Sequence, residues 1–121
     1  MLGRVDYESL PGLYRDHDIF VTASISETFG HPLVEAMASE IPLVAAETSV
    51  HKEVCKGAAI YFNSVSAEAL VEKIKLLDLN PKLREQITET GLNLGKSMYD
   101  WNTHVDRLLS FFTEIYQKNS R

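Results

Sequence analysis

The chain has 121 residues, of which 45% are hydrophobic and 24% charged, and its formal net charge is −5 at neutral pH. These values indicate one globular domain with a hydrophobic core rather than a disordered segment, and no apolar run approaches the ~20 residues that a membrane span needs. The acidic balance and the scattered Lys and Arg residues provide no basic surface for a nucleic-acid backbone, so we expect no nucleic-acid partner.

Short apolar runs and helical patterns alternate along the chain. In chain order they predict a strand end at 2–5, a helix over 7–15, a strand at 19–23, a helix over 32–39, a strand at 42–46, a helix over 50–56, a strand at 58–62, and three helices that follow Ser66, Asn80 and Asp100. Continuous apolar strands separated by helices are typical of right-handed βαβ units. We therefore expect an α/β fold over residues 1–121, with a Rossmann-like, three-layer parallel sheet and flanking helices.

Most of the unusual polar chemistry follows the three predicted strands, in segments 24–30, 47–52 and 63–66. In open parallel sheets, ligands bind outside the carboxyl ends of the strands. We therefore expect these three segments to share one edge of the sheet and to form one site.

The stretch SETFGHPLVEAMA places Glu27 and Glu35 on either side of a Phe-Gly-His-Pro turn. If a helix begins at Pro32, Glu35 lies in its first turn, where the helix dipole favours a carboxylate, and Glu27 is a solvated loop acid. Alternatively, free N–H groups at this helix start hold a phosphate, Gly30 allows close backbone approach, and the two acids accept hydrogen bonds from sugar hydroxyls. The spacing alone leaves both interpretations open.

Several segments together resemble one protein family: LPGLYRDHDIFV, SETFGHPLVEAMASEIPLVAA, SVHKEV, AAIYFN, NPKLREQITETG and YDWN, in this order along the chain. They are similar to the carboxyl-terminal domain of retaining glycosyltransferases with the GT-B fold, the group 1 family or family 4, including its E-x7-E motif at Glu27 and Glu35. The resemblance implies transfer of a hexose from a UDP-, GDP- or ADP-sugar to a sugar, lipid or other acceptor, with retained anomeric configuration.

The resemblance also implies residue roles. Glu35 would hold the ribose hydroxyls, and Glu27, the expected catalytic residue, would bind and orient the donor sugar beside its anomeric carbon. Backbone contacts to the sugar and diphosphate are implied for Phe29, Gly30, His31 and Leu33. No cofactor and no metal is implied, since the nucleotide-sugar is a substrate. Thr48–Ser49 stands where the family often has two glycines, and Glu40 where it has a helix-ending glycine.

The similarity begins in the middle of a domain. We therefore expect the earlier strands of this domain, the basic residues that hold the diphosphate and the amino-terminal acceptor domain to be absent, and the fragment to be inactive alone. An unpaired sheet edge would then favour a homodimer. We expect a cytoplasmic location, with the full-length enzyme peripheral to the inner face of the membrane. The alternatives are a non-catalytic Rossmann-like module and a glycosidase, which needs both acids at one bond.

Four other features have simpler interpretations. The sequence Asp16-His17-Asp18 could bind a metal, but it precedes a strand and is expected at the opposite, amino edge of the sheet. His31 could contact a ligand through its side chain or only through its backbone. Trp101 is expected to pack rather than to bind sugar. Cys55, the single cysteine, is expected to be a buried thiol.

Overall fold

The computed structural model describes residues 3–119, which form three strands and six α-helices. The strands are β1 (Phe20–Thr22), β2 (Leu43–Ala46) and β3 (Ala59–Phe62). The helices are α1 (Leu10–Arg15), α2 (His31–Ala38), α3 (Ser49–Cys55), α4 (Ala67–Asp78), α5 (Pro81–Met98) and α6 (Trp101–Asn119), and a 3-10 turn at Tyr7–Ser9 precedes α1. All three strands and all six helices correspond to expected elements.

The three strands form one parallel sheet in the order β1-β2-β3, with Phe20 opposite Leu43 and Leu43 opposite Ala59. This confirms the predicted α/β fold. The strand expected at 2–5 is not found: Leu2 lies outside the described residues, and residues 3–5 are not in a strand. A strand needs a hydrogen-bonded neighbour, and no described strand pairs with this segment.

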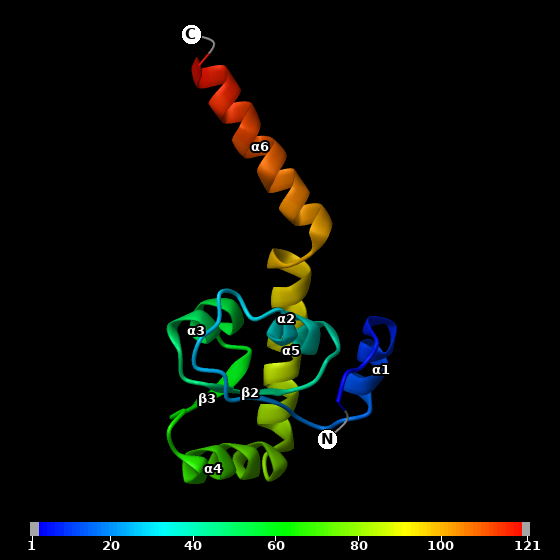
Figure 1. The fold of residues 1–121 in the computed structure, drawn as a ribbon, viewed down its shortest axis with the longest axis vertical. Coiled ribbons are helices and arrows are strands. Elements are labelled where there is room, and N and C mark those ends of the chain that lie inside the picture. The colour runs from blue at the N-terminus through cyan, green and yellow to red at the C-terminus, as the bar shows by residue number, and fades with distance from the viewer. Residues whose placement is uncertain (1–2, 120–121) are drawn as a thin grey trace.

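Both faces of the sheet are covered, which explains why β2 has no alternation of polar and apolar residues. Leu43 and Ala45 belong to a cluster with residues of α2 and α3, whereas Val44 and Ala46 belong to a second cluster with residues of α4 and α5. Figure 1 shows α2 and α3 on one side of the strands and α4 on the other. The core therefore consists of two apolar layers separated by the sheet.

Side-chain caps begin the later helices where the sequence predicts them. Ser66 Oγ accepts a hydrogen bond from the Ala69 N–H at 3.1 Å, and Asn80 Oδ1 accepts one from Leu83 at 3.2 Å. Asp100 Oδ2 accepts one from Thr103 at 3.0 Å. Each cap satisfies one of the N–H groups that a helix start leaves without a partner.

The last helix, α6, projects away from the body of the molecule (Figure 1) and contains no buried residue. Its exposed apolar side chains include Leu108, Leu109, Phe111, Phe112, Ile115 and Tyr116. Trp101 was expected to pack, but it is 74% exposed, and its ring lies beside that of His104, with 5.6 Å between centroids. The expectation was wrong because α6 leaves the core at its first residue. Within residues 3–119, no helix has both the length and the apolar composition needed to cross a membrane.

Candidate functional site at the carboxyl edge of the sheet

The segments that follow the three strands lie at one edge of the sheet, as expected, because the strands are parallel neighbours. The segment after β1 contains Glu27 and turns at Phe29 and Gly30 directly into α2. This segment leads from an exposed loop to the buried start of a helix. The loop part with Glu27 is therefore accessible to a ligand, and the backbone at Gly30 is held in place by the core.

Gly30 begins α2 in a left-handed conformation that glycine adopts more readily than any other residue. Its φ is +81° and it is buried, and a Cβ placed on it would lie 2.8 Å from Leu33 Cδ1. The Gly30 carbonyl accepts a hydrogen bond from the Leu33 N–H at 2.9 Å. Leu33 itself is 2% exposed and belongs to the core, so its side chain anchors the turn. Because its N–H is bonded to the Gly30 carbonyl, that N–H is not available to a ligand.

Backbone donors remain available at the start of α2. Within residues 3–119, no acceptor is found for the N–H groups of Phe29, Gly30 and His31, and Pro32 has no N–H. His31 is exposed, and its ring meets Phe29 edge-on, with 5.1 Å between centroids. Unpaired N–H groups at a helix start are suited to an anionic oxygen.

Glu35 does not lie in the first turn, contrary to the expectation based on a helix that starts at Pro32. The helix begins one residue earlier, at His31, and its first turn contains no acid. The helix dipole acts mainly within the first turn, so it is not the main partner of this carboxylate. Instead, Tyr14 Oη in α1 donates a hydrogen bond to Glu35 Oε2 at 2.8 Å. Burial, and secondarily this bond to Glu35, raise the pKa of Tyr14 above its ordinary value.

Glu27 is exposed, in contrast to the half-buried Glu35. The structure gives these two carboxylates no common hydrogen-bonding partner, and within residues 3–119 no arginine or lysine forms an ion pair with either. The two carboxylates therefore have different surroundings: Glu27 is open to solvent, and Glu35 is held by Tyr14.

Tyr14 and Tyr99 support this site but were not singled out from the sequence. The Tyr99 ring packs edge-on against Phe29, with 5.6 Å between centroids, and its hydroxyl donates to the Val54 carbonyl at 2.9 Å. Both tyrosines belong to segments that carry the family resemblance, in LPGLYRDHDIFV and YDWN. Their place in these segments was the only sequence signal for the two tyrosines. The contacts themselves join Tyr14 to Glu35, 21 positions apart, and Tyr99 to Phe29, 70 positions apart, so they are visible only in the fold.

The segment after β2 is held mainly by internal contacts. Thr48 Oγ1 caps α3 by accepting a hydrogen bond from the His51 N–H at 3.1 Å, and the buried His51 ring has Nδ1 2.8 Å from the Ala46 carbonyl oxygen. Glu47 and Lys52 form an exposed ion pair of 2.7 Å, and this partner lowers the pKa of Glu47. Thr48 therefore has a structural role here.

Cys55 is fully buried, as expected. Burial raises its pKa to about 12, so the reactive thiolate is scarce at neutral pH. The thiol is therefore part of the core rather than of the site.

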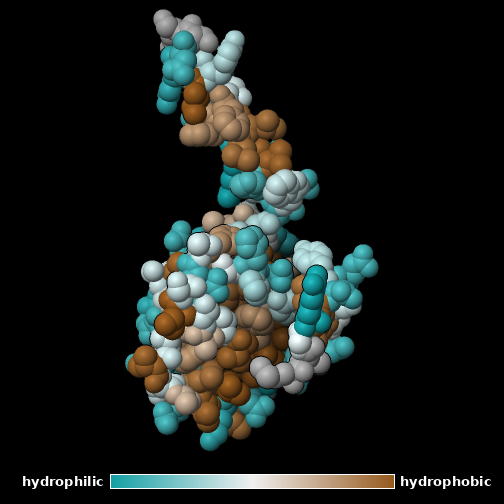
Figure 2. Space-filling model, viewed as in Figure 1, coloured by the Kyte–Doolittle hydropathy of each residue, from teal (hydrophilic) through white to brown (hydrophobic). Residues whose placement is uncertain are grey.

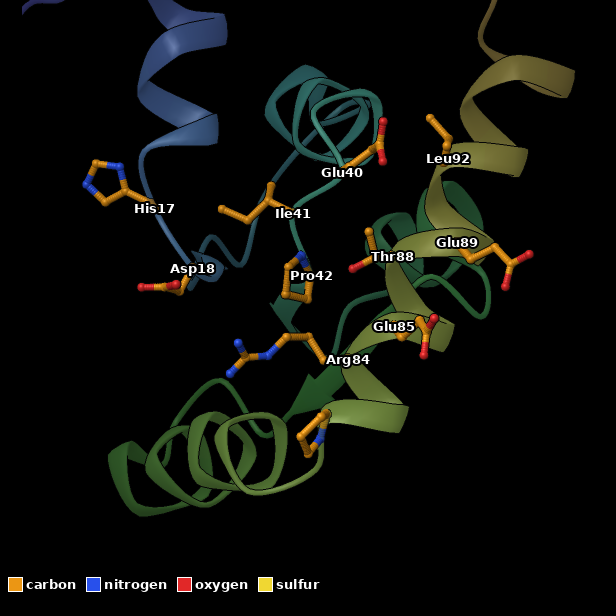
Figure 3. A pocket seen from close by; sticks show the side chains of 11 residues that line it. His17, Asp18, Glu40, Ile41, Pro42, Arg84, Glu85, Thr88, Glu89 and Leu92 are labelled. Carbon is orange, nitrogen blue, oxygen red and sulfur yellow. The ribbon is translucent and has the colours of Figure 1, made fainter.

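A cleft of about 620 Å³ lies at the amino edge of the sheet, opposite the candidate site, beside the residues that precede β1 and β2 (Figure 3). Its lining includes Asp18, Glu40, Glu85 and Glu89, and Arg84 extends into it from α5. This confirms that the Asp16-His17-Asp18 stretch lies at the amino edge. Within residues 3–119 no group of three or more His, Cys, Asp or Glu residues is arranged to hold a metal ion.

The parallel sheet, covered by helices on both faces and with a glycine-initiated helix at its carboxyl edge, defines the class: a Rossmann-like α/β domain. Residues 1–93 match the family described as Glycosyl transferases group 1. The chain belongs to this family of glycosyltransferases.

Individual relatives agree with this assignment. The chain is 26% identical over 99% of its length to the phosphatidyl-myo-inositol mannosyltransferase of Mycobacterium leprae. It is 29% identical, with a TM-score of 0.73 and 84% of the chain covered, to the C-terminal domain of the group 1 glycosyl transferase LpcC from Francisella tularensis. The sucrose-phosphate synthase of Thermosynechococcus elongatus, at 19% identity, shares the fold over 97% of the chain with a TM-score of 0.84.

The chain is much shorter than these proteins. It spans 33% of the mannosyltransferase, 30% of the sucrose-phosphate synthase chain and 53% of the LpcC domain. The shared fold therefore covers only a part of each relative.

Proposed function

We propose that this chain is the donor-binding part of a retaining glycosyltransferase, which transfers a hexose from a UDP-, GDP- or ADP-sugar to an acceptor. The observation that carries the proposal is the start of α2, where unpaired N–H groups at Gly30 and His31 lie between Glu27 and Glu35 in the sequence. A diphosphate fits the N–H groups, and hydroxyl groups fit the two carboxylates.

In this proposal each acid has a separate task. Glu35, fixed on α2, accepts hydrogen bonds from the ribose, and the exposed Glu27 binds a hydroxyl of the donor sugar and orients its anomeric carbon. Negative charge develops on the leaving diphosphate during transfer, and N–H groups that are already in position stabilise that charge. His31 contributes its backbone N–H, and Leu33 contributes mainly a buried side chain that holds the turn.

Calorimetric titration of two variants tests these roles. Glu35→Gln should weaken binding of a nucleoside diphosphate and of its sugar conjugate by the same factor, roughly 5- to 50-fold, because both carry ribose. Glu27→Gln should weaken only the sugar conjugate. Glu89→Gln, an acid at the opposite edge of the sheet, is the control and should change neither affinity.

Some results would contradict the proposal. If the unmodified chain binds none of UDP, GDP, ADP and their hexose conjugates, or if Glu89→Gln has the largest effect, the donor-site proposal fails. The first of these results favours the non-catalytic Rossmann-like module that the sequence also allows.

The proposal extends to partners and location. The acceptor would be a sugar, lipid or other molecule held by a further domain of the kind that the longer relatives have room for. A cytoplasmic location fits a chain whose single cysteine is buried and free, with no disulfide to gain from an oxidising compartment. We also propose that the chain on its own self-associates through its exposed apolar surface.

A further inference from the structure

Tyr14 and Glu35 are linked across two helices that are distant in the sequence. The tyrosine hydroxyl in α1 donates to Glu35 Oε2 in α2 at 2.8 Å, over a separation of 21 residues. The Tyr14 ring packs against the core, and it lies 5.8 Å from the ring of Phe20 in β1 at an interplanar angle of 45°. The donor is therefore held in place from the sheet as well as from α1.

This hydroxyl is the hydrogen-bonding partner that the structure gives to the Glu35 side chain within residues 3–119. An ionised carboxylate has about four acceptor positions on two oxygens, so Oε1 and the remaining positions on Oε2 stay available. Both residues line a small pocket of about 180 Å³ between α1 and α2, together with Ala38 and Ser39. A tyrosine hydroxyl is protonated at neutral pH, and burial raises the pKa of Tyr14 still further, so the hydroxyl acts as a donor to Glu35.

We infer that Tyr14 is a positioning residue for Glu35: its hydroxyl holds Oε2 so that Oε1 is presented to a ribose hydroxyl. The inference rests on the proposed function, and it adds a residue to which that proposal gives no role. A glutamate side chain on a helix has several accessible rotamers. Loss of the hydroxyl would release the carboxylate into these rotamers and so weaken its bond to the ribose. The competing explanation is that the bond merely joins α1 to α2.

The experiment compares ribose with a sugar that lacks its hydroxyls. The full chain is titrated with UDP, GDP and ADP, and the diphosphate that binds most tightly is then compared with its 2′,3′-dideoxy counterpart. In the unmodified chain the ribonucleotide should bind more tightly. Tyr14→Phe should reduce this preference roughly 3- to 10-fold, the effect of one typical hydrogen bond, and leave the affinity for the dideoxy compound unchanged.

Tyr61→Phe is the matched control. Tyr61 is also half-buried, and its hydroxyl donates a bond of similar length, 2.7 Å, to the Lys56 carbonyl, with no contact to Glu35. Its removal should lower the midpoint of thermal unfolding without changing the preference for ribose.

The possible results distinguish a failure of the positioning role of Tyr14 from a failure of the proposed donor site. If the unmodified chain prefers the ribonucleotide and Tyr14→Phe preserves that preference, the positioning role is overturned and the donor site stands. An equal loss for both ligands would show that the bond only supports the fold, which also overturns the inference. If the unmodified chain shows no preference, or binds no nucleotide, the ribose contact of Glu35 fails and the inference fails with it.

Discussion

Gly30 fixes the geometry of the site more directly than either acid does. Its left-handed backbone starts α2 at His31 and leaves the neighbouring N–H groups unpaired. A side chain here would meet both backbone strain and the Leu33 side chain, whose Cδ1 would lie 2.8 Å from the new Cβ. The position therefore favours glycine even when no ligand is bound.

Gly30→Ala should destabilise the chain by about 1–2 kcal/mol, because a residue with a Cβ disfavours the left-handed region by that amount. Gly95 lies in α5 with open space around the position of a Cβ. Gly95→Ala should therefore stabilise the chain by about 0.5–1 kcal/mol. Urea unfolding measures both free energies, and a Gly30→Ala variant as stable as the unmodified chain would refute the strained-turn account.

The arrangement of the residues in the candidate site was only partly predictable from the sequence. Glu27, Glu35 and the turn between them were recognisable from their spacing and neighbours. Two features were not recognisable. The first is the start of α2 at His31, because a left-handed glycine rather than a side-chain cap begins this helix. The second is the hydrogen bond from Tyr14 to Glu35. The second depends on how α1 packs beside α2, which local sequence patterns do not specify.

The secondary-structure elements were largely predictable because their local signals agree with their burial. The continuous apolar run of β2 correctly indicated a strand covered on both faces, and Ser66, Asn80 and Asp100 correctly indicated helix starts. The apolar spacing of α6 predicted a helix but not what it contacts. An apolar face indicates that a helix can pack against another surface, but it does not indicate that this surface belongs to the same chain.

Removal of α6 tests whether this helix contributes to the fold. The helix has no buried residue, and its cap at Asp100 precedes it. A chain ending at residue 100 should therefore unfold cooperatively, with a midpoint within a few degrees of that of the full chain, when followed by circular dichroism. Loss of cooperative unfolding would show that α6 packs on the body in solution.

The face of the molecule seen in Figure 2 exposes apolar surface on α6 and on the lower part of the body. A groove of about 240 Å³ runs along β1, whose outer edge has no described strand beside it. Its lining comprises Leu10, Leu13, Tyr14, His17, Ile19, Phe20, Val21 and Ile41. Unpaired strand edges and large apolar patches favour association.

We therefore expect light scattering to give a mass above that of one chain as the concentration rises toward the millimolar range. Val21 lies at the centre of β1 and is 39% exposed, so Val21→Lys should shift the equilibrium toward the monomer by placing a charge on the edge strand. A mass of one chain at every concentration would contradict the proposed self-association.

The two edges of the sheet differ in how well they suit a negatively charged ligand. The amino edge has the wider cleft, of about 620 Å³, but several of its side chains are carboxylates, which repel a diphosphate. The carboxyl edge has the unpaired N–H groups of residues 29–31, which suit an anionic oxygen. We therefore propose the carboxyl edge as the site of the nucleotide-sugar.

Amide chemical shifts, followed while UDP, GDP and ADP and their hexose conjugates are added to the chain, test this placement most directly. We expect at least one nucleotide to perturb the amides of Gly30, His31 and Glu35, and its sugar conjugate also to perturb the amide of Glu27. Perturbations confined to Asp18, Arg84 and their neighbours, or none with any of the six ligands, would contradict it.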